Sequence, residues 1–168
     1  IDWIGYFTAY ITPRPSDPEQ PRRQRAYLEA LKTLPCLEVI PGHFLEVEKS
    51  GILLSSQNTN VVKFKTFEEK GSDVNLACRL VLHGARGAFD QAIVVTNDGD
   101  LREPIKIVVH ELGLPVHIIS PDVTINGTLR NVATSASSLD TRMLRHCLFP
   151  PTLVNADGVA ISRPPTWA

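Results

Sequence analysis

Two short acidic stretches carry the side chains best suited to chemistry. Asp73 lies in the run EKGSDVNLA at 69–77, and Asp98 and Asp100 lie in VVTNDGDL at 94–101. Carboxylates gathered at the mouth of a parallel sheet hold a divalent cation against a phosphate. These residue types therefore indicate Asp73, Asp98 and Asp100 as candidate ligands of Mg²⁺ or Mn²⁺.

The flanking residues place these acids at one edge of a predicted sheet. Asp98 follows the apolar residues 93–95, and Gly99 permits a tight turn before Asp100. Asp73 begins the preceding predicted helix. Because sites in α/β sheets form beyond the carboxyl ends of the strands, we expect the three carboxylates to converge there.

Each acid also has a purely structural interpretation. Asp100 with Glu103 fits a variant capping box, and Ser72 fits a helix N-cap with Asp73 favoured by the helix dipole. Asp98 has no obvious structural partner in the sequence. A D-x-D pair alone is weak evidence, so the combination with Asp73 carries more weight than either fragment.

The elements that position these residues are predicted from periodicity and turn signals. Strands are expected at 3–11, 37–40, 43–47, 61–67, 92–96 and 115–120, and helices at 22–34, 72–85, 101–112 and 139–149. The polar segment 48–60 indicates a loop or hairpin. The alternation of strands and helices after residue 72 predicts crossover units and a parallel sheet.

Composition limits the function classes. The 168 residues are 43% hydrophobic with a net charge of -1, which fits one domain with one core. Affinity for nucleic acid must then come from a local basic patch. The cysteines are three, an odd number, and are widely spaced, which indicates free, mostly buried thiols in a reducing cytoplasm. No apolar run is long enough for a membrane span.

Two groups of cations are candidates for contacts with RNA phosphates. Lys63, Lys65 and Lys70 lie along or just after a predicted strand, and Arg22 and Arg23 stand at the start of the first predicted helix. The structural alternative for both groups is an ordinary solvated face, and the sequence leaves both interpretations open.

The order of six segments resembles the NYN domain, a branch of the PIN-like nucleases, in its bacterial stand-alone form. These segments are FTAYI, PRRQRAYLEAL, PGHF, EKGSDVNLA, FDQAIVVTNDGDLREPI and LGLPVHIISP. The resemblance implies a three-layer, Rossmannoid α/β/α sandwich with a mainly parallel central sheet over 1–150. The proline-rich segment 151–168 is expected to be an extended tail that Trp167 would pin down.

The same resemblance implies metal-dependent cleavage of RNA. The family's acidic site falls on Asp73, Asp98 and Asp100, with Asn75, Thr96 and Asn97 as neighbours of second rank. The family's first strand, which ends in Asp, is incomplete here, and Asp2 is carried as a provisional fourth ligand. We expect Mg²⁺ or Mn²⁺ as cofactor, RNA as partner, and room for a homo-oligomer or protein partner.

Two other functions stay open at this point. A non-catalytic RNA-binding or assembly module would keep the fold and the basic residues but would need no metal. A metal-dependent transferase using D-x-D on a nucleotide sugar would need a phosphate-binding loop, and the sequence has no glycine-rich loop of that kind.

Overall fold

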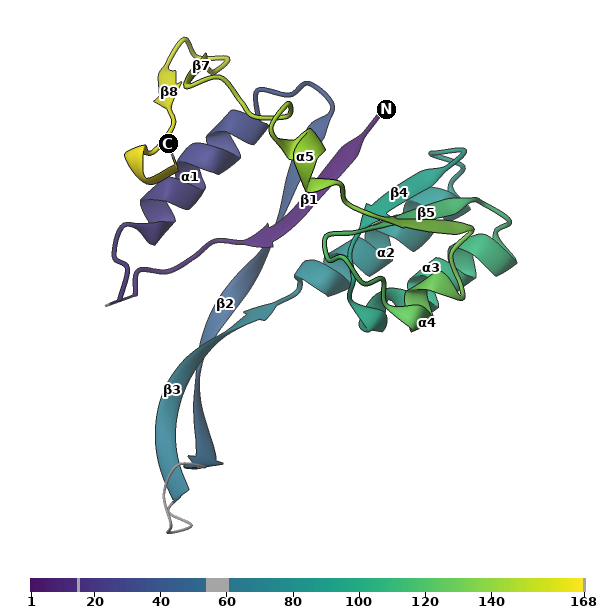
Figure 1. The fold of residues 1–168 in the computed structure, drawn as a ribbon, viewed down its shortest axis with the longest axis horizontal. Coiled ribbons are helices and arrows are strands. Elements are labelled where there is room, and N and C mark those ends of the chain that lie inside the picture. The colour runs from purple at the N-terminus through teal and green to yellow at the C-terminus, as the bar shows by residue number, and fades with distance from the viewer. Residues whose placement is uncertain (15, 54–60, 168) are drawn as a thin grey trace. The chain divides into compact units, whose positions relative to one another are not determined.

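The structure is a computed structural model that describes residues 1–14, 16–53 and 61–167 (Figure 1). The chain divides into two compact units, Ile1–Ser72 with Pro151–Ala168 and Asp73–Pro150. Both contain helices and strands, so the predicted α/β class is confirmed. No helix of the described ranges has the length and apolar character to cross a bilayer.

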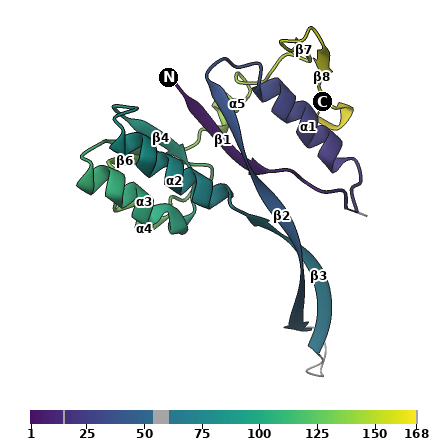
Figure 2. The same cartoon turned by 180° about the vertical axis from the view of Figure 1, so that it is seen from behind.

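The sheet of the first unit is built on one long strand. Strand β2 (Leu37–Ile52) pairs in parallel with β1 (Ile4–Ala9) along its first part and antiparallel with β3 (Val61–Lys70) along its second. Figure 2 shows β2 and β3 continuing together as a twisted ribbon. The predicted strands 37–40 and 43–47 are thus a single strand, and part of the predicted loop 48–60 is strand as well; its residues 54–60 lie outside the described residues.

Gly42 marks the point at which β2 changes partner. A β-carbon added there would lie 2.5 Å from the backbone oxygen of Lys70 and 2.9 Å from the hydroxyl oxygen of Ser72. Only glycine allows such a close approach to the end of β3. The Pro41-Gly42 pair predicts a break between two strands. In the structure it lies within β2 and allows the end of β3 to approach the β2 backbone closely.

Helix α1 (Gln20–Leu31) lies in the first unit, close to the predicted range 22–34. Pro21 stands at its start, where a missing N–H costs nothing, and its buried side chains include Leu28 and Leu31. The tail expected to be extended forms a small hairpin of β7 (Thr152–Val154) and β8 (Ala160–Ser162) and a 3₁₀ turn, η3 (Pro165–Trp167).

The second unit is a parallel three-stranded sheet with helices. Strands β4 (Ala92–Val95), β5 (Val116–Ser120) and β6 (Ser135–Ser138) pair in that order. The helical elements are α2 (Ser72–Ala85), η1 (Gly99–Leu101), α3 (Arg102–Lys106), η2 (Ile107–Glu111), α4 (Gly127–Arg130) and α5 (Thr141–Leu144). The alternation after residue 72 therefore predicts this parallel sheet correctly.

One hydrophobic core holds the second unit together. Val94, Val116 and Ile118 from the sheet pack in it with Ile105 and Val108 from the helical segment that follows η1. Four of these five side chains are fully buried, and each contributes about 1.5–3 kcal/mol of burial free energy. The core thus fixes the strand ends from which the acidic residues project.

Three sequence predictions are corrected by the structure. The helix expected at 139–149 is the single turn α5, because residues 141–148 are all exposed and have no packing to stabilise a longer helix. Strand β6 was not expected, since Ala136 is the single apolar residue in its sequence SASS. The three cysteines are free, but Cys78 and Cys147 are exposed and only Cys36 is half-buried.

A single three-layer sandwich around a mainly parallel sheet is not confirmed. The strands of the described residues form a mixed sheet, a parallel sheet and a two-stranded hairpin. Periodicity indicates which residues form strands but not the direction in which two strands pair, and β3 pairs antiparallel with β2. The predicted division into 1–150 and 151–168 stays a prediction.

Candidate active site

A tight turn at the carboxyl end of β4 positions Asp98. The backbone N–H of Asp98 donates to the hydroxyl oxygen of Thr96 at 3.1 Å, and Oδ1 of Asp98 accepts the backbone N–H of Asp100 at 2.9 Å. Asp98 is therefore the N-cap of η1. The expectation that Asp98 lacks a structural partner is wrong, because the partner is a backbone N–H that becomes available only when the turn forms.

Capping leaves part of the Asp98 carboxylate open. Both Asp98 and Asp100 are exposed, and Oδ2 of Asp98 accepts no hydrogen bond from any residue in the described ranges. Asp98 caps the start of this helical segment, in place of the predicted capping box of Asp100 with Glu103. The Asp100 side chain is therefore not needed as a helix cap. The turn presents two carboxylates, one of them held by a backbone hydrogen bond.

Asn97 joins this turn to the loop after β5. Its Nδ2 donates to Oδ2 of Asp122 at 2.8 Å and to the backbone oxygen of Thr124 at 3.0 Å. Its Oδ1 accepts the backbone N–H of Asn126 at 2.7 Å. The three hydrogen bonds fix the two loops against each other at the carboxyl edge of the sheet.

Asp122 is a site residue that sequence reasoning missed. It lies two positions after the last residue of β5, as Asp98 lies three after the last residue of β4. Its backbone N–H donates to the hydroxyl oxygen of Ser120, which is completely buried. An acid just past a buried strand was the signal for Asp98, and the same signal in IISPD identifies Asp122.

Gly99 and Asn126 complete the junction between the loops. A β-carbon on Gly99 would lie 3.1 Å from Nδ2 of Asn126 and 3.3 Å from the hydroxyl oxygen of Thr128. Oδ1 of Asn126 caps α4 by accepting the backbone N–H of Thr128 at 2.9 Å. A side chain at position 99 would therefore be tightly packed against the loop that contains Asn126 and Thr128.

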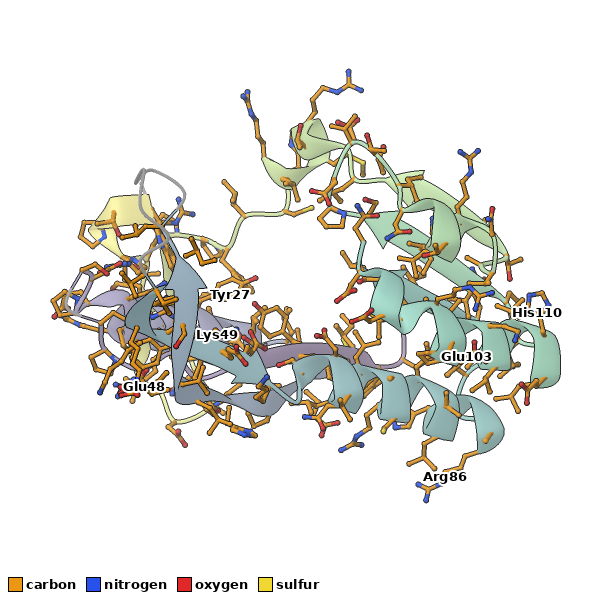
Figure 3. The ribbon with its side chains drawn as sticks, turned by 90° about the horizontal axis from the view of Figure 1, so that it is seen from below. Tyr27, Glu48, Lys49, Arg86, Glu103 and His110 are labelled. Carbon is orange, nitrogen blue, oxygen red and sulfur yellow. The ribbon has the colours of Figure 1, made fainter. Side chains whose placement is uncertain are left out.

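Asp73 approaches from a different element. It stands in the first turn of α2, and its neighbour Asn75 lies in the same helix. Figure 3 shows Arg86, just beyond the end of α2, and His110, in η2, at the same end of the second unit. Helix α2 leads into the amino end of β4, and the helical segment that ends in η2 leads into the amino end of β5. The first turns of both therefore point to the edge of the sheet where the strands end.

The acidic residues do not form a complete metal centre in the described part of the chain. No group of three or more His, Cys, Asp or Glu side chains among them is arranged to hold a metal ion. Asp73, Asp98 and Asp100 are thus not gathered into a three-carboxylate centre, and the centre stays a prediction. The donor chemistry does fit hydrated magnesium, which binds through one or two carboxylates, waters and substrate phosphate oxygens.

Most of the predicted RNA-binding cations are engaged in ion pairs within the first unit. Nζ of Lys65 lies 2.5 Å from Oε1 of Glu46, and Nζ of Lys70 lies 2.6 Å from Oε2 of Glu68. Lys63 is exposed and has no ion-pair partner in the described part of the chain. It is the lysine of this strand most available to a phosphate.

The arginines predicted to contact RNA are paired as well. Arg23 forms an ion pair with Asp17, and Nη1 of Arg22 lies 3.5 Å from Oε2 of Glu19. The hydrogen bond from Arg23 lowers the pKa of Asp17 and raises that of Arg23. The Arg22–Glu19 pair is exposed and therefore weak, so a phosphate competes for Arg22 at low cost, whereas the Arg23–Asp17 pair is half-buried.

The charges on the ribbon of β2 and β3 are paired across the strands. Glu68 accepts from Lys49 and from Lys70, and these bonds hold its pKa at about 2. The hydrogen bond that Lys65 donates to Glu46 raises the pKa of Lys65. Lys49 is labelled in Figure 3. The ribbon is therefore a lattice of opposite charges and not a uniform basic face.

The provisional ligand Asp2 lies in the first unit and is exposed, two residues before β1. Since β1 begins at Ile4, Asp2 stands at the amino end of that strand. Its assignment as a fourth ligand stays a prediction.

The family model described as NYN domain matches residues 11–140, a span that contains Asp73, Asp98 and Asp100 but not Asp2. No curated protein matches the chain. Among solved structures, the chain is similar to the crystal structure of VPA0982, a protein of unknown function from Vibrio parahaemolyticus RIMD 2210633. The TM-score is 0.50 and the identity 17%, over 80% of this chain and 67% of that one. This likeness concerns the fold alone.

Proposed function

Because the chain belongs to the NYN domain family, which lies among the PIN-like nucleases, we propose that it is a metal-dependent ribonuclease acting at the carboxyl edge of the β4–β5–β6 sheet. The observation that carries the proposal is the Asp98 turn. It holds one carboxylate by a backbone hydrogen bond and leaves Oδ2 and Asp100 open.

The residues of the turn have separate roles in this proposal. Asp98 and Asp100 would hold Mg²⁺ or Mn²⁺, and Asp73 would contribute a third carboxylate from α2. When bound, the metal supplies an activated water and neutralises charge on the phosphate. Asn97 keeps the turn in place through its hydrogen bonds to the loop after β5.

Low metal affinity in the absence of RNA follows from this arrangement. With no group of three ligands preformed among the described residues, the RNA phosphate itself has to complete the coordination. Metal and RNA then strengthen each other's binding, because each provides a partner for the other.

Cleavage of a labelled single-stranded RNA by the full chain tests the proposal. We expect cleavage with magnesium or manganese, none with EDTA, and a loss of orders of magnitude in Asp98→Asn. Asp90→Asn, an exposed acid in the same unit, is the matched control and should cleave normally. A well-folded Asp98→Asn protein with undiminished cleavage would contradict the proposal.

The second candidate, a non-catalytic RNA-binding or assembly module, is favoured by one observation. The described residues contain no preformed group of three metal ligands. This alternative predicts that RNA binds equally strongly in EDTA and in magnesium. It also predicts that the wild-type chain does not cleave RNA with magnesium or with manganese. Cleavage that EDTA abolishes excludes it.

A further inference from the structure

The first unit contains a pocket of about 380 Å³ that the candidate active site does not use. It is formed by β1, α1 and the final 3₁₀ turn η3. Figure 1 shows η3 beside α1. The volume lies in the range of small-molecule pockets and is suited to one nucleotide.

Three aromatic side chains from distant parts of the chain meet in this pocket. The ring of Tyr27 lies 6.0 Å from that of Tyr6 and 6.1 Å from that of Trp167, with nearly perpendicular planes. The expected contact of Trp167 with the body of the protein is thus made with Tyr27. Trp167 remains 45% exposed, so its ring is accessible from solvent. Accessible rings of this kind stack on nucleic-acid bases of any sequence.

The polar side chains of the pocket divide into a fixed and an available group. Gln24 is fixed, because its Nε2 donates to the backbone oxygen of Ala9 and its Oε1 accepts the N–H of Ile11, both at 2.8 Å. Gln20 and Thr8 line the pocket and make no side-chain hydrogen bond with the described residues. These two side chains are available to the polar edge of a base.

Arg23 gives the pocket its charge. It is the only charged residue among those that line the pocket in the described part of the chain, so no carboxylate lines it. Its ion pair with Asp17 uses only part of a guanidinium group that has five N–H donors. The remaining donors favour a phosphate.

We propose that this pocket binds one nucleotide of single-stranded RNA, with its base against Trp167 and Tyr27 and its phosphate at Arg23. The proposal rests on the proposed function, since it names a place where the substrate strand is held. Aromatic rings, a free amide and an arginine together recognise a base and its phosphate.

Binding of a short fluorescent oligouridine to the full chain in EDTA tests the pocket without involving cleavage. We expect Trp167→Ala to weaken binding about tenfold, the usual effect of losing one stacked base, and Trp167→Phe to restore most of it. Trp3→Ala is the matched control, because Trp3 is 39% exposed in the same unit and does not line the pocket. Unchanged binding by a folded Trp167→Ala protein overturns the proposal.

A second variant and a competitor complete the binding experiment. Arg23→Gln should weaken binding and reduce its salt dependence, and it serves as the second variant where Trp167→Ala fails to fold. Free uridine monophosphate is the competitor: displacement at concentrations near those of the oligonucleotide identifies a free nucleotide as the ligand and overturns the RNA assignment. Weak displacement supports it.

The outcomes for the pocket and for the proposed function are separable. Binding that depends on Trp167 in a chain that never cleaves RNA supports the pocket and overturns the nuclease. If cleavage depends on Asp98 but RNA binding is unchanged by the Trp167 and Arg23 variants, the nuclease proposal is supported and the pocket proposal is overturned.

Discussion

Asn97 and Asp122, 25 positions apart, are joined by a hydrogen bond of 2.8 Å from Nδ2 of the amide to Oδ2 of the carboxylate. The bond connects the ends of two neighbouring parallel strands, β4 and β5. It holds Asp122, a carboxylate absent from the predicted site, at the same edge of the sheet as Asp98. The rigidity of this edge is therefore shared between two loops.

Asn97→Ala should destabilise the second unit by about 2–3 kcal/mol, because the half-buried N–H of Asn126 loses its acceptor and Asp122 loses its donor. Thermal and urea unfolding measure the change. Asn131→Ala, at an exposed asparagine of the same unit, should change stability by less than about 0.5 kcal/mol. Equal effects of the two variants would show that the junction is not stabilising.

Asp98 variants should separate catalysis from folding. Asp98→Asn keeps an oxygen that accepts the Asp100 N–H, so stability should hold while metal-dependent cleavage falls by orders of magnitude. Asp98→Ala also removes the cap and should cost about 1 kcal/mol. Thermal melts beside an RNA cleavage assay measure both effects. Loss of fold in Asp98→Asn would assign this residue a structural role alone.

Gly99→Ala tests the close packing of the two loops. Its β-carbon would lie 3.1 Å from Nδ2 of Asn126, so the Asn126 side chain has to move and its hydrogen bonds weaken. We expect a loss of about 1 kcal/mol and reduced cleavage. Gly127→Ala is the control, since a β-carbon there meets nothing within 4 Å, and it should be neutral or slightly stabilising.

Lys63 should contribute more to RNA binding than Lys65. Lys63→Ala should weaken binding similarly for all RNA sequences and lower the salt slope by about one, whereas Lys65→Ala should do less because its ammonium is held by Glu46. Glu46→Gln releases Lys65 and should strengthen binding. Fluorescence anisotropy across a salt series measures these changes, and an effect confined to one RNA sequence would argue against phosphate contacts.

Glu68 should make the stability of the ribbon depend on pH. Its pKa is about 2 in the folded chain, against an ordinary value of 4.5, because of hydrogen bonds from Lys49 and Lys70. A lowered folded pKa gives stability that is complete above 4.5 and is lost as the pH falls from 4.5 towards 2. Hydrogen exchange of β2 and β3 over this window measures it.

The matching variants for Glu68 isolate its contribution. Glu68→Gln should lack this part of the pH dependence and be less stable than wild type near neutral pH. Glu48→Gln, at an exposed position of the same ribbon, should keep the wild-type profile. A Glu68→Gln protein with an unchanged profile would show that the two lysine bonds do not stabilise the ribbon.

The sequence by itself determined the elements whose signals are local. Helix α2 begins and ends where the glycine at 71, the serine at 72 and the apolar period place it, and Gly71 has the positive φ of 93° that favours glycine. The apolar runs of β4 and β5 were predicted for the same reason: burial of a strand shows in the composition of a few consecutive residues.

Only the tertiary structure decided what depends on distant partners. The Asp98 cap forms with a backbone N–H that becomes free in a turn, and the bond of Asn97 to Asp122 needs the register of β4 on β5. The partner change of β2 at Gly42 needs the end of β3 beside it. Hydrogen bonds between residues far apart follow from strand order and register, which side-chain periodicity along one strand does not encode.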